Sequence, residues 1–250
     1  MSKRRFLPPR RTHWLLAAAI LGMSAWFFPY FPPLGSPNEL SRLYLTRAIV
    51  DDGSFSIDGP VARYGRITDL ASYEGRLHSD KAPGIGMAGV PLYVAAKALA
   101  GWDAEALPNS WLLRLMRFFL SGIPTAGCVL LLFYLLGRLE IDRDKRLFLT
   151  AAYGVATIAF TYGVLLFGHQ TASLCLLGAF AVAERHGRKP GGLAPVVAGF
   201  LLGTALLMEY TTILLVVPLA IYAIITAPRR LRDSLAGLGG CLLPLGLLAL

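Results

Sequence analysis

Glu39 and Lys81 are the residues whose types and positions best suit a group-transfer reaction. A carboxylate such as that of Glu39 can take a proton from a hydroxyl nucleophile, which then attacks an electron-poor carbon more readily. A lysine ammonium such as that of Lys81 can stabilise a phosphate leaving group through charge-assisted hydrogen bonds. Both residues lie in one polar segment, 32–110, between apolar parts of the chain. We therefore treat Glu39 as a candidate catalytic base and Lys81 as a candidate phosphate ligand.

Each of these two residues also has a structural interpretation. Glu39 stands three positions after Ser36, and Pro37 follows the serine, which is the pattern of a helix capping box. Glutamine can replace glutamate in such a cap, whereas it cannot act as a base. Lys81 could instead be an interfacial lysine whose ammonium reaches the membrane surface along its apolar stem. The sequence leaves both pairs of alternatives open.

Further polar residues could contact a substrate. Asp80 is either a second acid or, as we prefer, the ion-pair partner of a neighbouring base. Glu209 and His169 each stand between two apolar runs, where a carboxylate in particular is costly unless it faces a cavity. His169 could bind a phosphate or an acceptor, or it could cap a helix. The candidate substrate-binding residues are Lys81, Asp80, Arg63, Arg66, Arg76, Arg117, His169, Glu209 and Tyr210.

Other reactive motifs are absent from the sequence. It contains no Gly-rich phosphate loop, no zinc-ligand spacing and no nucleophile elbow, so we assign no metal ligand and leave a divalent metal open. Cys128, Cys175 and Cys241 all lie inside apolar runs, and we interpret them as small core residues. We interpret Asp142-Arg143-Asp144 as part of a solvated basic loop and not as a metal-binding Asp-x-Asp motif.

The composition indicates an integral membrane protein. Hydrophobic residues make up 55% of the chain and charged residues 16%, with a mean hydropathy of +0.57. An average soluble domain has about a quarter of its residues charged. The net charge of +9 is carried mostly by basic clusters between apolar runs. This distribution favours membrane orientation over nucleic-acid binding as the reason for the excess charge.

The basic clusters predict the topology. They are the N-terminal tail and the segments 138–146, 185–189 and 229–232, and the positive-inside rule places all four in the cytoplasm. An even number of crossings must then separate neighbouring clusters. The sequence thus predicts an all-α bundle of seven transmembrane helices with a cytoplasmic N-terminus, in one domain covering residues 1–250.

Four further details complete the predicted topology. We expect residues 14–31 to form an uncleaved first helix and not a signal peptide, because no small-x-small cleavage site ends the run. If the apolar run 85–100 crossed the membrane, the basic segment 138–146 would lie outside, against the positive-inside rule. We therefore predict a helix that lies on the outer membrane surface or dips partly into the membrane. Outer turns are expected at 168–170 and 209–212. The last run, 235–250, lacks a polar flank, and we expect the chain to be truncated relative to a larger family.

The segment 32–110 is predicted to hold the active site on the extracytoplasmic side. Apolar spacings of three and four predict a helix that starts near Ser36 and stops at Asp51-Asp52-Gly53. Alternation over Ser54–Gly59 predicts a short strand. The charged stretch from Tyr73 to Gly84 then leads into the surface helix.

The order of these features resembles the GT-C superfamily of membrane glycosyltransferases. An acidic residue, Glu39, opens an amphipathic helix directly after the first apolar run. Asp52-Gly53-Ser54-Phe55 follows it, and Lys81-Ala82-Pro83 precedes the apolar surface helix. The chain looks similar to bacterial relatives of protein O-mannosyltransferases and aminoarabinose transferases. The resemblance implies a polyprenyl-phosphate-linked sugar donor, an acceptor that is a lipid, glycan or protein, and transfer at the outer face of a bacterial-type cytoplasmic membrane.

Two other functions remain as alternatives. A transporter or flippase for a lipid-linked or anionic solute would place charges within the spans, whereas this chain concentrates them at the predicted outer face. A truncated, non-catalytic membrane scaffold is the second alternative. We expect membrane lipids as partners, and we expect no nucleic acid.

Overall fold

The computed structural model describes residues 11–26, 35–99 and 107–249, and these fold almost entirely into helices. The helices before residue 140 are α1 (Thr12–Trp26), α2 (Pro37–Arg47), α3 (Asp58–Tyr64), α4 (Gly84–Leu99), α5 (Asn109–Arg117) and α6 (Ile123–Arg138). Those after it are α7 (Arg143–Ala156), α8 (Ile158–Val164), α9 (His169–Arg188), α10 (Ala194–Met208), α11 (Ile213–Thr226) and α12 (Arg230–Leu245). The prediction of an all-α fold is therefore confirmed, with one small β-hairpin as an addition.

Short irregular elements complete the chain. The π-helical turn η1 (Ala48–Asp52) extends α2, and η2 (Phe118–Gly122) joins α5 to α6. The 3-10 turns η3 (Tyr210–Thr212) and η4 (Gly246–Ala249) adjoin α11 and α12. The strands β1 (Leu70–Tyr73) and β2 (Arg76–Ser79) pair antiparallel, with Leu70 opposite Ser79 and Tyr73 opposite Arg76.

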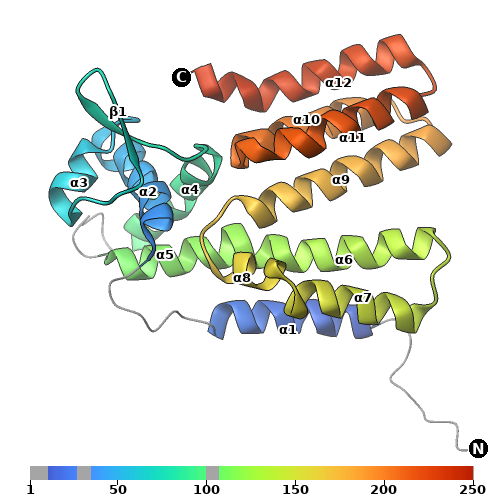
Figure 1. Ribbon diagram of the computed structural model, residues 1–250, viewed down its shortest axis with the longest axis horizontal. Helices are drawn as coiled ribbons and strands as arrows, with labels where there is room; N and C mark the ends of the chain where they lie inside the picture. The colour runs from blue at the N-terminus through green and yellow to red at the C-terminus, as the bar shows by residue number, and fades with distance from the viewer. Residues whose placement is uncertain (1–10, 27–34, 100–106, 250) are drawn as a thin grey trace, which may run out of the picture.

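Figure 1 shows two parts that lie end to end. The first, which we call the cap unit, comprises residues 35–99 and holds α2, α3, the hairpin and α4. The second, which we call the bundle, comprises α1, α6, α7, α9, α10, α11 and α12, whose axes run roughly side by side. Helix α6 packs against α1, α7 and α9, while α10 packs against α9 and α12. Helix α5 continues α6 beneath the cap unit, and α4 packs against α2, α5 and α10.

Among the described residues, one helix is long and apolar enough to cross a membrane, Asn109–Arg138, with 30 residues. The pair α7 and α8 would form a second if its 57° bend lay within one span. Helices α1, α4 and α10 and the segment Tyr210–Thr226 are apolar but shorter. The seven predicted spans are therefore still a prediction. Residues 27–31 of the predicted first helix lie outside the described residues.

The capping box at Ser36 starts the cap unit as predicted. The Ser36 side chain accepts a hydrogen bond from the Glu39 N–H, and the Glu39 carboxylate accepts one from the Ser36 N–H at 3.1 Å. Helix α2 and η1 end at Gly53, whose φ of 61° is a conformation that glycine adopts without steric cost. The expected helix from Ser36 to the Asp51-Asp52-Gly53 stop is thus confirmed.

The predicted strand over Ser54–Gly59 is wrong. The Ser54 hydroxyl accepts a hydrogen bond from the Ser56 N–H, and the Ser56 hydroxyl donates to Asp58 at 2.6 Å. These local contacts hold a turn that starts α3, because serine and aspartate side chains compete with strand pairing for backbone groups. The strands form later, around Glu74-Gly75, where positive φ values of 50° and 77° suit a two-residue hairpin turn.

Breaks between helices lie at both predicted outer turns, although His169 and Gln170 of the first already belong to α9 and the outer location stays a prediction. One lies between Val164 and His169, and the other is Glu209 with η3. At the first break, a Cβ added to Gly168 would collide with the carbonyl oxygen of Met208. This close backbone approach brings the N-terminus of α9 against the C-terminus of α10, and so places His169 near Glu209.

Small residues allow close packing elsewhere in the bundle. Cβ atoms at Gly199 and Gly240 would collide with the backbone of Gly237 and Val196, so α10 and α12 touch through their main chains. Cys128 and Cys175 are buried and Cys241 is half-buried, and all three are free thiols. This agrees with their interpretation as packing residues.

Candidate functional site

Glu39 lies at the junction between the cap unit and the bundle, with both carboxylate oxygens engaged. Oε1 accepts hydrogen bonds from Arg117 Nε and from the Leu166 N–H, each at 2.7 Å. Oε2 accepts from Arg117 Nη2 at 2.7 Å and from the Ser36 N–H. The residue is 1% exposed. A general base must lie within hydrogen-bonding reach of the proton it removes. In this conformation Glu39 offers no free surface to an acceptor.

The electrostatics of Glu39 agree with a carboxylate that is ionised at neutral pH. Burial alone would raise the pKa of its side chain above the ordinary 4.5. The hydrogen bonds and positive charge of Arg117, together with the Leu166 and Ser36 N–H groups, outweigh burial and lower the pKa. Glu39 thereby ties α2 to α5 and to the segment between α8 and α9.

Lys81 and Asp80 belong to a second, more exposed cluster on the cap unit. Lys81 Nζ lies 3.0 Å from Asp69 Oδ2 and 3.1 Å from Asp80 Oδ2, and its side chain is 21% exposed. Burial would lower the pKa of this ammonium, but the two carboxylates raise it above the ordinary 10.5. Asp80 is therefore the ion-pair partner of a neighbouring base, as we preferred from the sequence.

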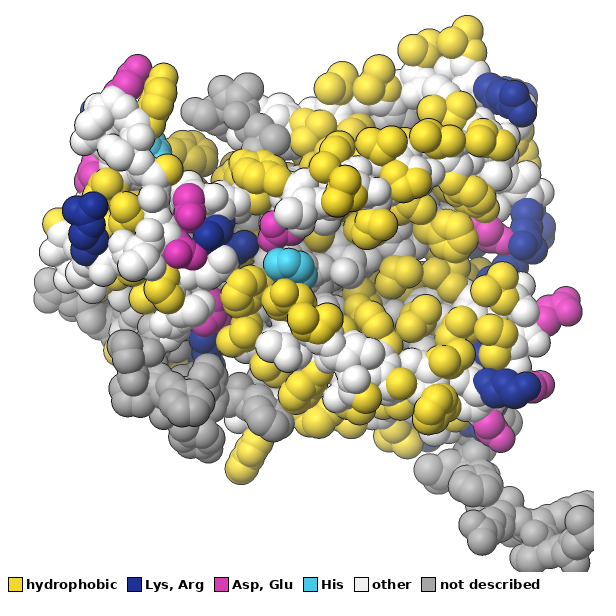
Figure 2. Space-filling view, in the orientation of Figure 1, with side chains coloured by type: hydrophobic (Ala, Val, Ile, Leu, Met, Phe, Trp, Pro, Cys, Tyr) yellow, Lys and Arg dark blue, Asp and Glu magenta, His cyan; other side chains and the backbone are white. Residues whose placement is uncertain are grey.

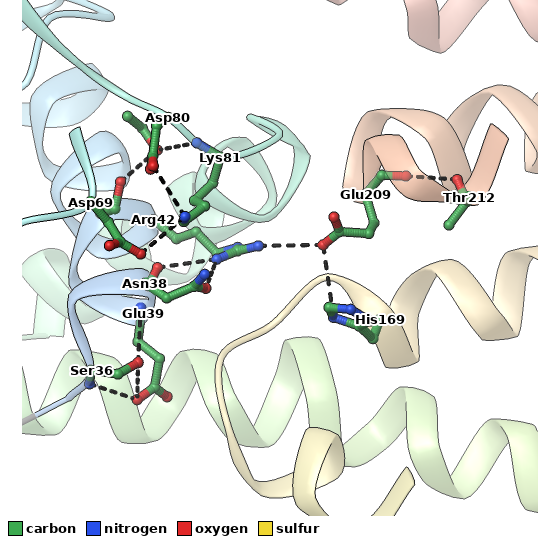
Figure 3. Close-up of polar contacts among 12 residues, drawn as sticks. Ser36, Asn38, Glu39, Arg42, Asp69, Asp80, Lys81, His169, Glu209 and Thr212 are labelled. Carbon is green, nitrogen blue, oxygen red and sulfur yellow. Dashed lines mark hydrogen bonds and ion pairs between the residues drawn. The ribbon is translucent and has the colours of Figure 1, made fainter. Parts of the chain in front are cut away.

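Arg42 links this cluster to the bundle (Figure 3). Its guanidinium extends from α2, hydrogen-bonds the Asn38 side chain and its carbonyl oxygen, and reaches Glu209 Oε2 at 3.5 Å. Glu209 in turn lies 3.7 Å from His169 Nδ1. Side chains from the cap unit and from the two bundle breaks thus meet in one place. We call Asn38, Arg42, Asp69, Asp80, Lys81, His169 and Glu209 the junction cluster.

Aromatic rings support the bundle side of the junction cluster. The His169 ring stacks on Tyr162, with centroids 4.1 Å apart and planes within 5°. The guanidinium of Arg42 lies over the ring of Phe167 at 5.5 Å. Both rings come from the α8–α9 region. Tyr162 and Phe167 therefore provide aromatic faces against which the His169 imidazole and the Arg42 guanidinium pack.

The remaining predicted site residues are spread more widely. Arg117 pairs with Glu39. Arg63 pairs with Asp52 at 2.8 Å, away from the junction cluster. Arg66 and Arg76 are exposed and form no ion pair with any described residue. Tyr210 follows Glu209 and is 51% exposed.

Sequence reasoning missed Asn38, Arg42 and Asp69. Arg42 stands four positions after Asn38 and three after Glu39 on the predicted helix, so helical spacing could have placed Arg42 beside both. Asp69 precedes β1 and reaches Lys81 only because the hairpin folds back, and no spacing rule shows that contact. Across the described ranges, no group of three His, Cys, Asp or Glu side chains could hold a metal ion.

The family comparison assigns the part of the chain from α5 onward to a known family. The family model of dolichyl-phosphate-mannose-protein mannosyltransferases matches residues 109–249, which is more than half of the chain. The chain belongs to this family. It is a glycosyltransferase of the GT-C type that uses a lipid-linked sugar donor, and its family acts in membranes. The match covers His169 and Glu209 and does not extend over the cap unit. No curated protein and no solved structure matches the chain.

Membership decides between the functions left open by the sequence. A family that transfers sugars from polyprenyl-phosphate donors favours the transferase over the transporter and the scaffold. The resemblance inferred from Glu39, Asp52–Phe55 and Lys81 is thereby confirmed at the level of the family. The roles of the individual residues stay predictions.

Proposed function

We propose that the chain transfers a sugar from a polyprenyl-phosphate donor to a hydroxyl acceptor at the extracytoplasmic face of the cytoplasmic membrane. The observation that carries this proposal is the junction cluster, in which two cations and three carboxylates meet beside apolar helix ends. Figure 2 shows charged side chains gathered where the cap unit meets the bundle. A lipid-linked donor needs its phosphate bound at such a boundary while its tail stays in the membrane.

The distribution of side chains supports a bundle that spans the membrane. Helix α6 ends at Arg138, α7 begins at Arg143, α9 ends at Arg188 and α12 begins at Arg230, all at the end remote from the cap unit. Hydrophobic side chains cover the surface between the two ends in Figure 2. The exposed large apolar side chains of the bundle helices include Phe148, Leu149, Phe200, Leu214, Ile225 and Leu243, each at least 42% exposed. A soluble monomer rarely exposes so continuous an apolar surface.

This arrangement agrees with the seven-span topology. The remote end then lies in the cytoplasm, and the cap unit lies outside with α4 against the bundle ends. Helix α9 has 20 residues, and Asn109–Arg138, which contains α6, has 30, so both are long enough for a hydrocarbon span of about 20 residues. The other bundle helices, α1, α7, α10, α11 and α12, are shorter than such a span. Adjoining turns such as η2 and η3 lengthen some of the segments.

Lys81 and Arg42 are the proposed ligands of the donor phosphate. Lys81 Nζ now contacts two carboxylates at 3.0 and 3.1 Å, and a phosphate oxygen could replace one of them without leaving the ammonium unpaired. The Arg42 side chain is 3% exposed, and its contact with Glu209 is long at 3.5 Å. Charge-assisted bonds from both groups would stabilise the phosphate as it leaves.

Glu209 is the proposed proton acceptor. Its side chain is 16% exposed, and its contacts with Arg42 and His169 are looser than those of Glu39 with Arg117. In the step, the acceptor oxygen bonds to the anomeric carbon, the bond from that carbon to the phosphate oxygen breaks, and the hydroxyl proton passes to Glu209. Polyprenyl phosphate leaves with the electron pair. The role of Glu39 is then to position α2, and with it Arg42.

The test uses the full chain reconstituted in nanodiscs with a panel of radiolabelled polyprenyl-phosphate sugars, starting with mannose. Released or transferred water-soluble sugar is measured by partition against solvent. We expect turnover for at least one donor, with loss in Lys81→Ala and in Glu209→Gln. Lys145→Ala is the control, because Lys145 is an exposed cation near the start of α7 and is not among the candidate substrate-binding residues. Equal turnover in all four proteins would refute the proposed site.

A further inference from the structure

A cavity lies at the end of the bundle remote from the junction cluster. Its volume is about 210 Å³, and α9, α10, α11 and α12 all contribute to its wall. The wall is almost entirely apolar and rich in small side chains, among them Ala183, Ala198, Ala220 and Ala223. An apolar cavity of about 150 Å³ in a soluble protein is large enough to hold benzene. This larger cavity can therefore hold part of an alkyl chain.

A polar pair closes the cytoplasmic end of this cavity. His186 Nε2 lies 3.0 Å from Asp233 Oδ2, which joins the end of α9 to the start of α12. His186 Nδ1 accepts the Gly191 N–H at 3.1 Å, and Asp233 accepts the Arg229 N–H at the same distance. These polar groups are satisfied by one another. The cavity thus presents apolar atoms to its occupant, with a polar boundary at one end.

Unpaired positive charge surrounds that boundary. Arg185 lies in the last turn of α9 and Lys189 follows it, while Arg229, Arg230 and Arg232 lie at the start of α12. All five side chains are exposed, and none forms an ion pair with another residue in the ranges that the structure describes. The dark blue side chains at the right edge of Figure 2 mark this end of the molecule. Glu184 and Asp233 are the acids nearby, and both already have partners.

We propose that this end of the bundle binds one anionic phospholipid, with an acyl chain in the cavity and its phosphate on the surrounding arginines. A membrane surrounds the four helices with alkyl chains, so an apolar cavity there fills with an alkyl chain and not with water. The exposed arginines and Lys189 then select a negatively charged headgroup, as basic pockets between membrane helices do. The binding is independent of sugar transfer at the other end.

The experiment titrates the purified full chain in detergent with palmitoyl-oleoyl phosphatidylglycerol or the matching phosphatidylcholine, and native mass spectrometry counts the bound lipids. We expect one phosphatidylglycerol to bind more tightly than phosphatidylcholine. Arg229→Gln with Arg230→Gln and Arg232→Gln should weaken phosphatidylglycerol by roughly fivefold for each arginine that contacts it. The same triple variant should leave phosphatidylcholine unchanged. Lys145→Gln, at an exposed cation near the start of α7, is the control.

Cavity-filling variants test the acyl-chain half of the proposal. Ala220→Phe and the smaller change Ala223→Leu should weaken both lipids, because each side chain occupies space in the cavity. Val197→Phe is the matched control on α10, since Val197 is 43% exposed and is not part of the wall. Size-exclusion chromatography establishes that each variant is folded.

Cys241 gives a readout that needs no substitution, because its side chain lines the cavity and those of Cys128 and Cys175 do not. Bound phosphatidylglycerol should slow its alkylation by N-ethylmaleimide, measured on the Cys241 peptide. Phosphatidylcholine should slow it less at equal concentration. Unchanged alkylation together with equal affinities for the two lipids would overturn the proposal. Protection by both lipids with no effect of the arginine changes would refute the headgroup assignment.

Discussion

The guanidinium of Arg117 holds the carboxylate of Glu39 through two hydrogen bonds of 2.7 Å, although 78 residues separate the two in sequence. This pair joins the first helix of the cap unit to the helix that continues into the bundle. Arg117 is 6% exposed, so neither charge can turn to water if its partner is removed. Breaking one side of such a buried pair leaves an uncompensated charge, at a typical cost of about 3–5 kcal/mol.

Glu39→Gln is therefore expected to lower stability markedly. Glutamine can keep the cap of α2, but its amide cannot neutralise Arg117, and it offers one acceptor oxygen where Glu39 offers two. We expect a clear drop in melting temperature of the purified protein in detergent, followed by intrinsic fluorescence or light scattering. Glu74→Gln, at an exposed hairpin turn, should melt like the wild type. A Glu39→Gln protein with normal stability but turnover reduced by about 10²–10⁴-fold would restore Glu39 as the base.

The same pair predicts a dependence of stability on pH. Because the pKa of Glu39 is lowered in the folded state, its contribution is fully present above the ordinary value of 4.5. The contribution is lost as pH falls below that value and through the folded pKa. The difference in melting temperature between wild type and Glu39→Gln should thus be constant from pH 6 to 8 and shrink below about 4.5. A difference that grows on acidification would contradict the ion pair.

Lys81 should matter more for its charge than for its shape. Lys81→Ala is expected to weaken the binding of a polyprenyl-phosphate sugar in nanodiscs more than Lys81→Arg, which keeps a cation near Asp69 and Asp80. Loss of a charged hydrogen bond corresponds to about 1.5–3 kcal/mol, or roughly 10- to 150-fold in affinity. Equal donor affinity for Lys81→Ala and the wild type would remove Lys81 from the site.

Glu209→Gln separates proton transfer from donor binding. We expect turnover on a hydroxyl acceptor, or on water, to fall by about 10²–10⁴-fold while donor affinity changes little. Tyr134→Phe is the control, because Tyr134 is 49% exposed on α6 and is not among the candidate substrate-binding residues. If Glu209→Gln lowers donor affinity and turnover together, the residue binds the donor and Asp80 becomes the next candidate base.

Topology can be measured by cysteine accessibility in intact cells. Ser72 lies exposed in β1 and Asp144 lies exposed at the start of α7, at opposite ends of the molecule. A cysteine at position 72 should react with an impermeant thiol reagent, and one at position 144 should react only after the cells are opened. The unaltered chain, whose three cysteines are buried or half-buried, gives the background. The reverse pattern would place the cap unit in the cytoplasm.

Much of the fold could be predicted because its signals are local. The capping box at Ser36, the stop at Gly53 and the breaks at His169 and Glu209 all follow from residue types within a few positions. The helix pattern of the bundle follows from apolar runs and from the basic residues between them. The prediction of a strand over Ser54–Gly59 was wrong because alternation of side chains alone cannot exclude turns held by serine and aspartate.

The site was less predictable because its contacts join distant segments. The capping box at Glu39 could be recognised from the sequence. The hydrogen bonds of the Glu39 carboxylate with Arg117 and Leu166 depend on how α2, α5 and the segment between α8 and α9 pack together. Arg42 could be placed beside Glu39 by helical spacing, whereas its contact with Glu209 spans 167 residues. Asp69 reaches Lys81 through the register of a hairpin that the sequence did not predict.

During synthesis, Glu39 is made before both of the groups that bind its carboxylate, Arg117 and the Leu166 N–H. The two residues are 127 apart, and Arg117 is made 78 residues after Glu39. At roughly 5–20 residues per second, Glu39 waits about 4–16 s for its counter-ion and about 6–25 s for the backbone donor. The cap unit therefore emerges before the groups that dock it exist, and it completes its attachment only after α8 has left the ribosome.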